Sequence, residues 1–140
     1  MQMLVLRKLV FSLVIGLFPQ IAAADPLSFV CSFDRSVAAN ISREFGIQID
    51  ERAEKDFTIR FVSEVRAETA QMIGNNGAAN VIPIWGDNRV TFVEITPNGT
   101  VQTTAVYGFR QGEKAAVHSR TTGGEGYELP SQYYGFCEVR

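Results

Sequence analysis

Residues 89–109 read RVTFVEITPNGTVQTTAVYGF and hold the strongest hairpin signal of the chain. β-Branched and aromatic side chains, which favour strands, dominate both sides of the turn at Asn98 and Gly99. Asn-Gly is the dipeptide that most readily adopts the left-handed backbone of a tight hairpin turn. The stretch therefore predicts two antiparallel strands joined by a short turn.

Similar segments lie on either side of this hairpin. They are DFTIRF at 56–61, NVIPIW at 80–85 and KAAVHSRT at 114–121, separated by the turn-forming words GNNG, GDN and RQGE. Strands that recur about every 10–12 residues between such turns are typical of an all-β fold. We expect an antiparallel meander that curls into a small barrel or a strongly twisted sheet.

Two parts of the N-terminal half leave room for helix. A short helix would place four apolar side chains on one face, Val37, Ala38, Ile41 and Phe45, although FGIQID beside them has an extended pattern. Residues 56–73 fit either strands or a helix. The charged segment 50–56 lacks the spaced oxygen ligands of an EF-hand, so a solvated loop is expected there.

The first residues have the order of a secretory signal peptide. Arg7 and Lys8 precede the apolar run 9–18, and small residues lead to a predicted cut between Ala24 and Asp25. The run is far shorter than the ~20 residues that span a bilayer, so no membrane span is expected after cleavage. We predict a signal peptide at 1–24 and a single β-rich domain at 25–140, located in the periplasm or secreted.

The two cysteines, Cys31 and Cys137, lie near the two ends of the predicted domain. An oxidising compartment permits one pairing, so a disulfide is expected; the alternative is two free buried thiols. The bond would tie the first strand, 27–33, to the last, 133–139, and would remove two exposed sheet edges. It would also exclude a cysteine nucleophile.

The charge balance argues against several partners and cofactors. The net charge is −2, and removal of the signal peptide takes away two basic residues and no acidic ones. A mildly acidic surface does not favour nucleic acid or anionic membrane. A lone histidine and paired cysteines supply no zinc-ligand set, and the glycines of 121–128 precede no helix that would hold phosphate. No metal and no cofactor are expected.

The only histidine, His118, lies in AAVHSRTTGG, residues 115–124. On a strand, His118 and Ser119 point to opposite faces and cannot form a nucleophile–base pair, whereas Arg120 shares the face of His118. No G-x-S-x-G motif is present, so we expect a non-enzymatic protein. His118 and Arg120 would contact a ligand if their face lines a barrel, and would be surface residues if that face is solvated.

Two further segments contribute candidate residues. LPSQYYGFC, residues 129–137, offers Gln132 and Tyr134 either to a binding surface or to the packing of one barrel end. Glu94, in TFVEIT, lies on a solvent face or forms a polar anchor with Arg120 or His118. These residues predict a binding module for a small molecule or an envelope protein. The oligomeric state is not predicted.

Four segments resemble the sequences of a group of small secreted proteins of Gram-negative bacteria. They are MIGNNGAANVIPI, TFVEITPNGTVQTTAV, AVHSR and PSQYYGFC. The resemblance covers roughly residues 72–137 and implies a periplasmic β-rich domain without an assigned activity, so no catalytic residue is carried over. A second likeness, of TTGGEGY at 121–127, is to small periplasmic lysozyme inhibitors. It implies the alternative function, inhibition of a lytic enzyme such as lysozyme through the Thr121–Tyr127 loop.

Overall fold

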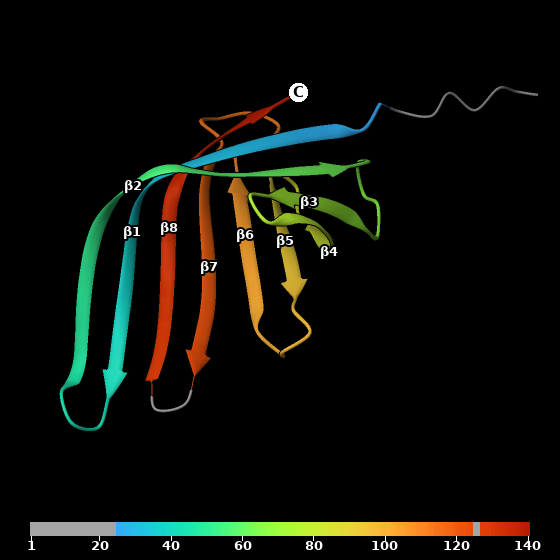
Figure 1. The fold of residues 1–140 in the computed structure, drawn as a ribbon. Coiled ribbons are helices and arrows are strands. Elements are labelled where there is room, and N and C mark those ends of the chain that lie inside the picture. The colour runs from blue at the N-terminus through green and yellow to red at the C-terminus, as the bar shows by residue number, and fades with distance from the viewer. Residues whose placement is uncertain (1–24, 125–126) are drawn as a thin grey trace, which may run out of the picture.

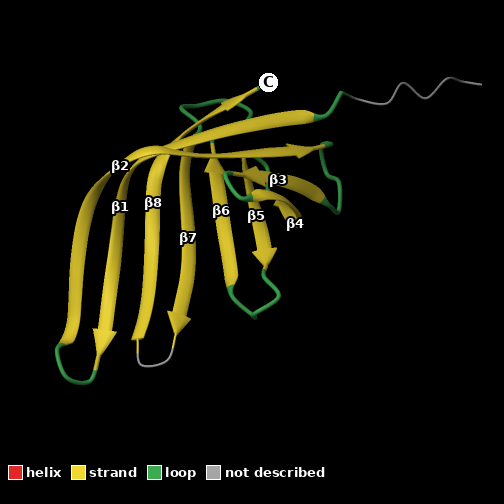
Figure 2. Ribbon diagram, viewed as in Figure 1, coloured by secondary structure: helices red, strands yellow, loops and turns green. Residues whose placement is uncertain are grey.

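The fold, seen in a computed structural model, is described for residues 25–124 and 127–140. It consists of strands within these ranges and contains no helix there (Figure 2). The strands are β1 (Leu27–Ser42), β2 (Gly46–Ser63), β3 (Ala70–Gly74), β4 (Gly77–Trp85), β5 (Arg89–Ile95), β6 (Val101–Tyr107), β7 (Ala115–Gly124) and β8 (Tyr127–Val139). The predicted all-β fold class is therefore confirmed.

The strands form a closed antiparallel barrel. Each strand pairs with the next along the chain, and β8 returns to pair with β1 (Figure 1). Cys31 and Cys137 face each other in the β1–β8 register and form a disulfide. The meander therefore closes as a barrel, and the predicted bond between its first and last strands is confirmed.

The short helix predicted around Val37 is wrong. Strand β1 continues through this region, where Val37 pairs with Glu51 on one side and Gln132 on the other. A helical spacing of apolar residues is a weak local preference, and hydrogen bonding to two neighbouring strands overrides it. Phe45 lies in the turn before β2, and the FGIQID segment is extended from Gly46 onward, as its pattern indicated.

The helix considered for residues 56–73 is also wrong, because β2 runs to Ser63 and β3 begins at Ala70. Residues 50–56 were expected in a solvated loop but belong to β2, where Asp50 pairs with Ala38. Most of these side chains are exposed, so the expectation that this charged segment is solvated is correct. Solvation alone does not distinguish a loop from the end of an exposed hairpin.

A bulge bends the longest strands. The β1 register shifts between Phe33 and Arg35 toward both of its neighbours. Such an insertion bends a strand and increases its twist. Figure 1 shows the result: β1 and β2 cross over one end of the barrel, then turn and run beside β8 and β7 past the ends of β5 and β6. The inner face thus continues beyond the closed part of the barrel.

The end of the barrel over which β1 and β2 cross, called the closed end below, is filled by aromatic side chains. Phe29, Phe61 and Phe92 are almost fully buried, and the rings of Phe61 and Phe92 stack with centroids 4.1 Å apart. Trp85 and Phe109 pack edge to face beside them, with centroids 5.8 Å apart. This end holds a continuous apolar core, so polar side chains on the inner face gather toward the other end.

Candidate functional site

Two polar rows cross the inner face of the barrel. Glu94 pairs with Gln102, and Gln102 pairs with Arg120, so these three residues are successive neighbours on β5, β6 and β7. In the adjacent row, Thr104 pairs with His118. Directly paired residues on one face bring their side chains about 5 Å apart. The register therefore gathers residues from three strands into one cluster.

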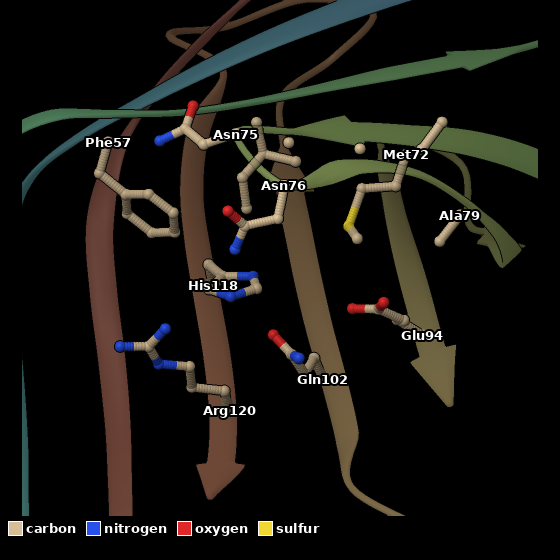
Figure 3. A pocket seen from close by; sticks show the side chains of 13 residues that line it. Phe57, Met72, Asn75, Asn76, Ala79, Glu94, Gln102, His118 and Arg120 are labelled. Carbon is tan, nitrogen blue, oxygen red and sulfur yellow. The ribbon is translucent and has the colours of Figure 1, made fainter. Parts of the chain in front are cut away.

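A cavity of about 330 Å³ opens over this cluster. Figure 3 shows Glu94, Gln102, His118 and Arg120 along one wall. The other walls include the apolar side chains of Phe57, Ile59 and Met72 and the amides of Asn75 and Asn76, which lie in the turn between β3 and β4. Its size and mixed lining are typical of small-molecule sites.

Arg120 is held in place by uncharged groups. Its Nε donates a hydrogen bond to Ser131 Oγ at 3.0 Å, and Nη2 donates to the Tyr133 hydroxyl. The guanidinium carbon also lies 4.7 Å from the centroid of the Tyr133 ring. The ion pairs among the side chains of 25–122 and 129–140 do not include Arg120. The half-buried guanidinium thus meets the cavity without an ion pair to a described carboxylate, although Glu54 lines a second cavity together with Arg120.

His118 is 2% exposed, and its Nδ1 lies 2.8 Å from Thr104 Oγ1. The rings of Phe33, Phe57 and Tyr133 surround it at centroid distances of 5.9, 5.7 and 5.8 Å. Burial, followed by the positive charge of Arg120, lowers the pKa of His118 from 6.5 to about 4. The imidazole is therefore neutral at neutral pH and has one N–H to donate.

The surroundings of His118 do not resemble a hydrolase site. Its Nδ1 contacts a threonine hydroxyl, whereas a triad histidine needs a carboxylate at this position. Ser119 pairs with Gln132 and alternates to the opposite face of β7, as the strand pattern predicted.

Glu94 lies on the inner face, where it is half-buried and lines the cavity. Of the two predicted locations, the solvent face is thus wrong. The predicted pairing is also wrong, because no ion pair joins Glu94 to Arg120 or His118 in the described ranges. The reason is the register, which puts Gln102 between Glu94 and Arg120.

Gln132 and Tyr134 are on the outer face, apart from His118 and Arg120. Tyr134 is 39% exposed, and its hydroxyl donates to Gln132 Oε1 at 2.7 Å. These four candidate residues therefore lie on two opposite faces of the sheet. Tyr133, which is buried against His118, is the tyrosine that belongs to the cluster.

The predicted site residues did not include Gln102, Thr104, Ser131 or Tyr133, although the last two lie in the segment 129–137 that the sequence singled out. A usable signal was present for two of them. Because the disulfide turns Cys137 inward, a period of two along β8 also turns Tyr133 and Ser131 inward.

The predicted Thr121–Tyr127 loop is shorter than expected, because β7 extends to Gly124 and β8 begins at Tyr127. Its tip, residues 125–126, and the predicted signal peptide, residues 1–24, lie outside the described residues. Inhibition of a lytic enzyme through this loop, and cleavage after Ala24, stay predictions.

No known protein family, curated protein or solved structure matches the chain. In the described ranges, no three His, Cys, Asp or Glu side chains are grouped closely enough to hold a metal ion. Residues 25–124 and 127–140 also contain no helix that is long and apolar enough to cross a bilayer.

Proposed function

We propose that this chain is a non-enzymatic binding module that holds a small molecule by an anionic group at Arg120 and His118. The observation that carries the proposal is the guanidinium of Arg120, which forms no ion pair with the side chains of 25–122 and 129–140, at the wall of a cavity of about 330 Å³. A half-buried cation is less well hydrated than a surface one, which strengthens its attraction for a carboxylate or phosphate.

The immediate surroundings of Arg120 support anion binding. Ser131 and Tyr133 fix its orientation through hydrogen bonds and ring contact. A preoriented guanidinium loses less conformational entropy on binding than a free side chain. If the Thr104 hydroxyl donates to Nδ1 of His118, the proton of the neutral imidazole is on Nε2, which supplies a second donor.

The low pKa of His118 favours binding over catalysis. A general base works best with a pKa near the operating pH, and a value of about 4 makes this imidazole a weak base. A neutral donor beside a permanent cation suits recognition. We place this module in the periplasm or outside the cell, because the Cys31–Cys137 disulfide is stable in an oxidising compartment and the first residues have the order of a signal peptide.

The test is a titration with hexanoate, a monoanion with a short apolar tail, followed by NMR of the single histidine. We expect the His118 resonances to shift on binding. Arg120→Gln should weaken hexanoate roughly 10- to 100-fold, since it removes a charge-assisted hydrogen bond. Arg120→Lys, which keeps the charge, should weaken it less. Tyr134→Ala, on the outer face, is the matched control and should bind as the wild type does.

Equal affinity of wild type and Arg120→Gln would overturn the proposal. The proposal would also be overturned if Tyr134→Ala weakened hexanoate binding and the His118 resonances did not shift on binding. Thermal unfolding of each variant checks that a lost response reflects the site and not the fold.

A further inference from the structure

We infer that the ligand is a dipeptide-sized zwitterion, with its carboxylate at Arg120 and its ammonium group at Glu94. The inference rests on the proposed anion site at Arg120 and extends it to the other end of the same cavity. The decisive feature is a pair of opposite charges that line one cavity without meeting each other.

Glu94 and Arg120 are the two ends of one polar row. They are separated by two strand spacings, about 10 Å, with Gln102 between them. Neither belongs to any ion pair among the side chains of 25–122 and 129–140, although both are only half-exposed. Figure 3 shows the Glu94 carboxylate and the Arg120 guanidinium on opposite sides of Gln102. A ligand with a positive and a negative end would neutralise both charges at once.

The separation selects the length of the ligand. Two residues of extended peptide span about 7 Å, and a hydrogen bond of about 2.9 Å is added at each end. This total of about 13 Å exceeds two strand spacings by about 3 Å, which fits because Arg120 leans away from Glu94, toward Ser131 and Tyr133 on β8. A single α-amino acid carries both charges on one carbon and cannot reach both Arg120 and Glu94.

The middle of the row suits a peptide group. Gln102 has one amide carbonyl and one amide NH₂, so it can accept from a peptide N–H and donate to a peptide C=O. Asn75 and Asn76 add two more amides to the cavity lining. No charge is present at this point of the row, and a peptide group carries none.

The apolar wall of the cavity indicates that the side chains of the ligand are small. Phe57, Ile59 and Met72 face the polar row across the cavity, and Ile59 is 5% exposed. The volume of about 330 Å³ is near the lower limit for small-molecule sites. Alanine-sized side chains would contact this wall, and two bulky ones would exceed the space.

Three probes of matched shape test the inference by calorimetric or NMR titration. Alanyl-alanine carries both charges. N-isobutyryl-alanine replaces the ammonium group by a methyl group and keeps the carboxylate. Alanyl-alaninamide keeps the ammonium group and loses the carboxylate. We expect alanyl-alanine to bind roughly tenfold more tightly than N-isobutyryl-alanine, as one half-exposed charge-assisted contact predicts, and alanyl-alaninamide to bind weakest.

Variants of Glu94 and Arg120 test which end of the dipeptide each residue binds. Glu94→Gln should reduce the affinity for alanyl-alanine to that for N-isobutyryl-alanine and leave the latter unchanged. Arg120→Gln should weaken both, and Arg120→Lys provides a second test if Arg120→Gln unfolds.

The outcomes separate the two proposals. Equal, Arg120-dependent binding of alanyl-alanine and N-isobutyryl-alanine, with no effect of Glu94→Gln, would overturn the zwitterion and leave the anion site standing. If neither carboxylate binds the wild type, both proposals are overturned.

Discussion

Acidification should destabilise this protein through its only histidine. In the folded protein the pKa of His118 is lowered to about 4, whereas the unfolded chain takes up a proton near 6.5. Between these values the unfolded state binds more protons, so the free energy of unfolding falls as the pH falls. Above pH 6.5 both states are neutral and this contribution is constant.

The size of the effect follows from the difference between the two pKa values. Each pKa unit corresponds to about 1.4 kcal/mol, so complete passage through the window removes about 3 kcal/mol. Small domains have free energies of unfolding of about 5–15 kcal/mol. The loss is therefore a large part of the total. Its causes are burial among Phe33, Phe57 and Tyr133 and repulsion by Arg120.

The assay is urea unfolding of wild type and His118→Gln at a series of pH values from about 7.5 to about 4. Glutamine keeps a hydrogen-bonding partner for Thr104 and does not titrate. Contributions from the acidic residues cancel in the difference between the two proteins. We expect a constant difference at high pH and a relative loss by the wild type of about 3 kcal/mol toward pH 4. Parallel profiles, or an NMR titration of His118 with a midpoint near its ordinary value, would refute the reasoning.

Two further perturbations test the fold. Gly135→Ala should cost roughly 3 kcal/mol or more in the free energy of unfolding, because its Cβ would overlap the Ser32 carbonyl oxygen and approach Phe33 Cα to 2.7 Å. Gly74→Ala, whose Cβ meets nothing within 4 Å and whose φ is not positive, is the control and should change it by well under half as much; equal losses would contradict the packing argument. Replacing both cysteines of the disulfide by alanine should cost about 2–5 kcal/mol in denaturant unfolding, since the bond joins residues 106 positions apart; an unchanged midpoint would show that strand pairing alone holds the barrel closed.

The all-β class and its meander were predictable because turn chemistry is local. Asn98 and Gly99 do form the turn between β5 and β6, where Gly99 has a φ of +84°. Barrel closure depended on one long-range inference, that Cys31 and Cys137 pair in an oxidising compartment. Within the described ranges, the turns and the disulfide account for the order in which the strands pair.

The failures have a common physical origin in long-range pairing. Val37 and Ala38 are strand residues because β2 and β8 lie on either side of them, and the local sequence does not contain those partners. The bulge at Phe33 and Arg35 also reverses which residues face inward, so that Phe33 and Ser36 are both buried. A period of two counted along β1 from Cys31 therefore places Phe33 correctly but misplaces the residues after the bulge.

The site was predictable only within single strands. His118 and Arg120 share a face because they are two residues apart on β7, and this much was foreseen. The partnership of Arg120 with Gln102 and Glu94 depends on the register of three strands. The register is fixed by turn geometry and core packing together, and a shift of one residue would turn each side chain to the opposite face.

The two ends of the barrel differ in the side chains that they hold. The closed end holds the stacked and tilted aromatic rings, whose burial supplies much of the apolar contact. At the other end, the buried polar side chains of the described residues all have partners, as His118 has in Thr104. Among the described side chains there, the half-exposed charges of Arg120 and Glu94 form no ion pair, and neither does Glu54, which lines a second cavity together with Arg120. Apolar side chains in place of Arg120 and Glu94 would extend the core at lower electrostatic cost, so stability alone does not explain these two charges. The proposed zwitterionic ligand, which brings an opposite charge to each, would explain them.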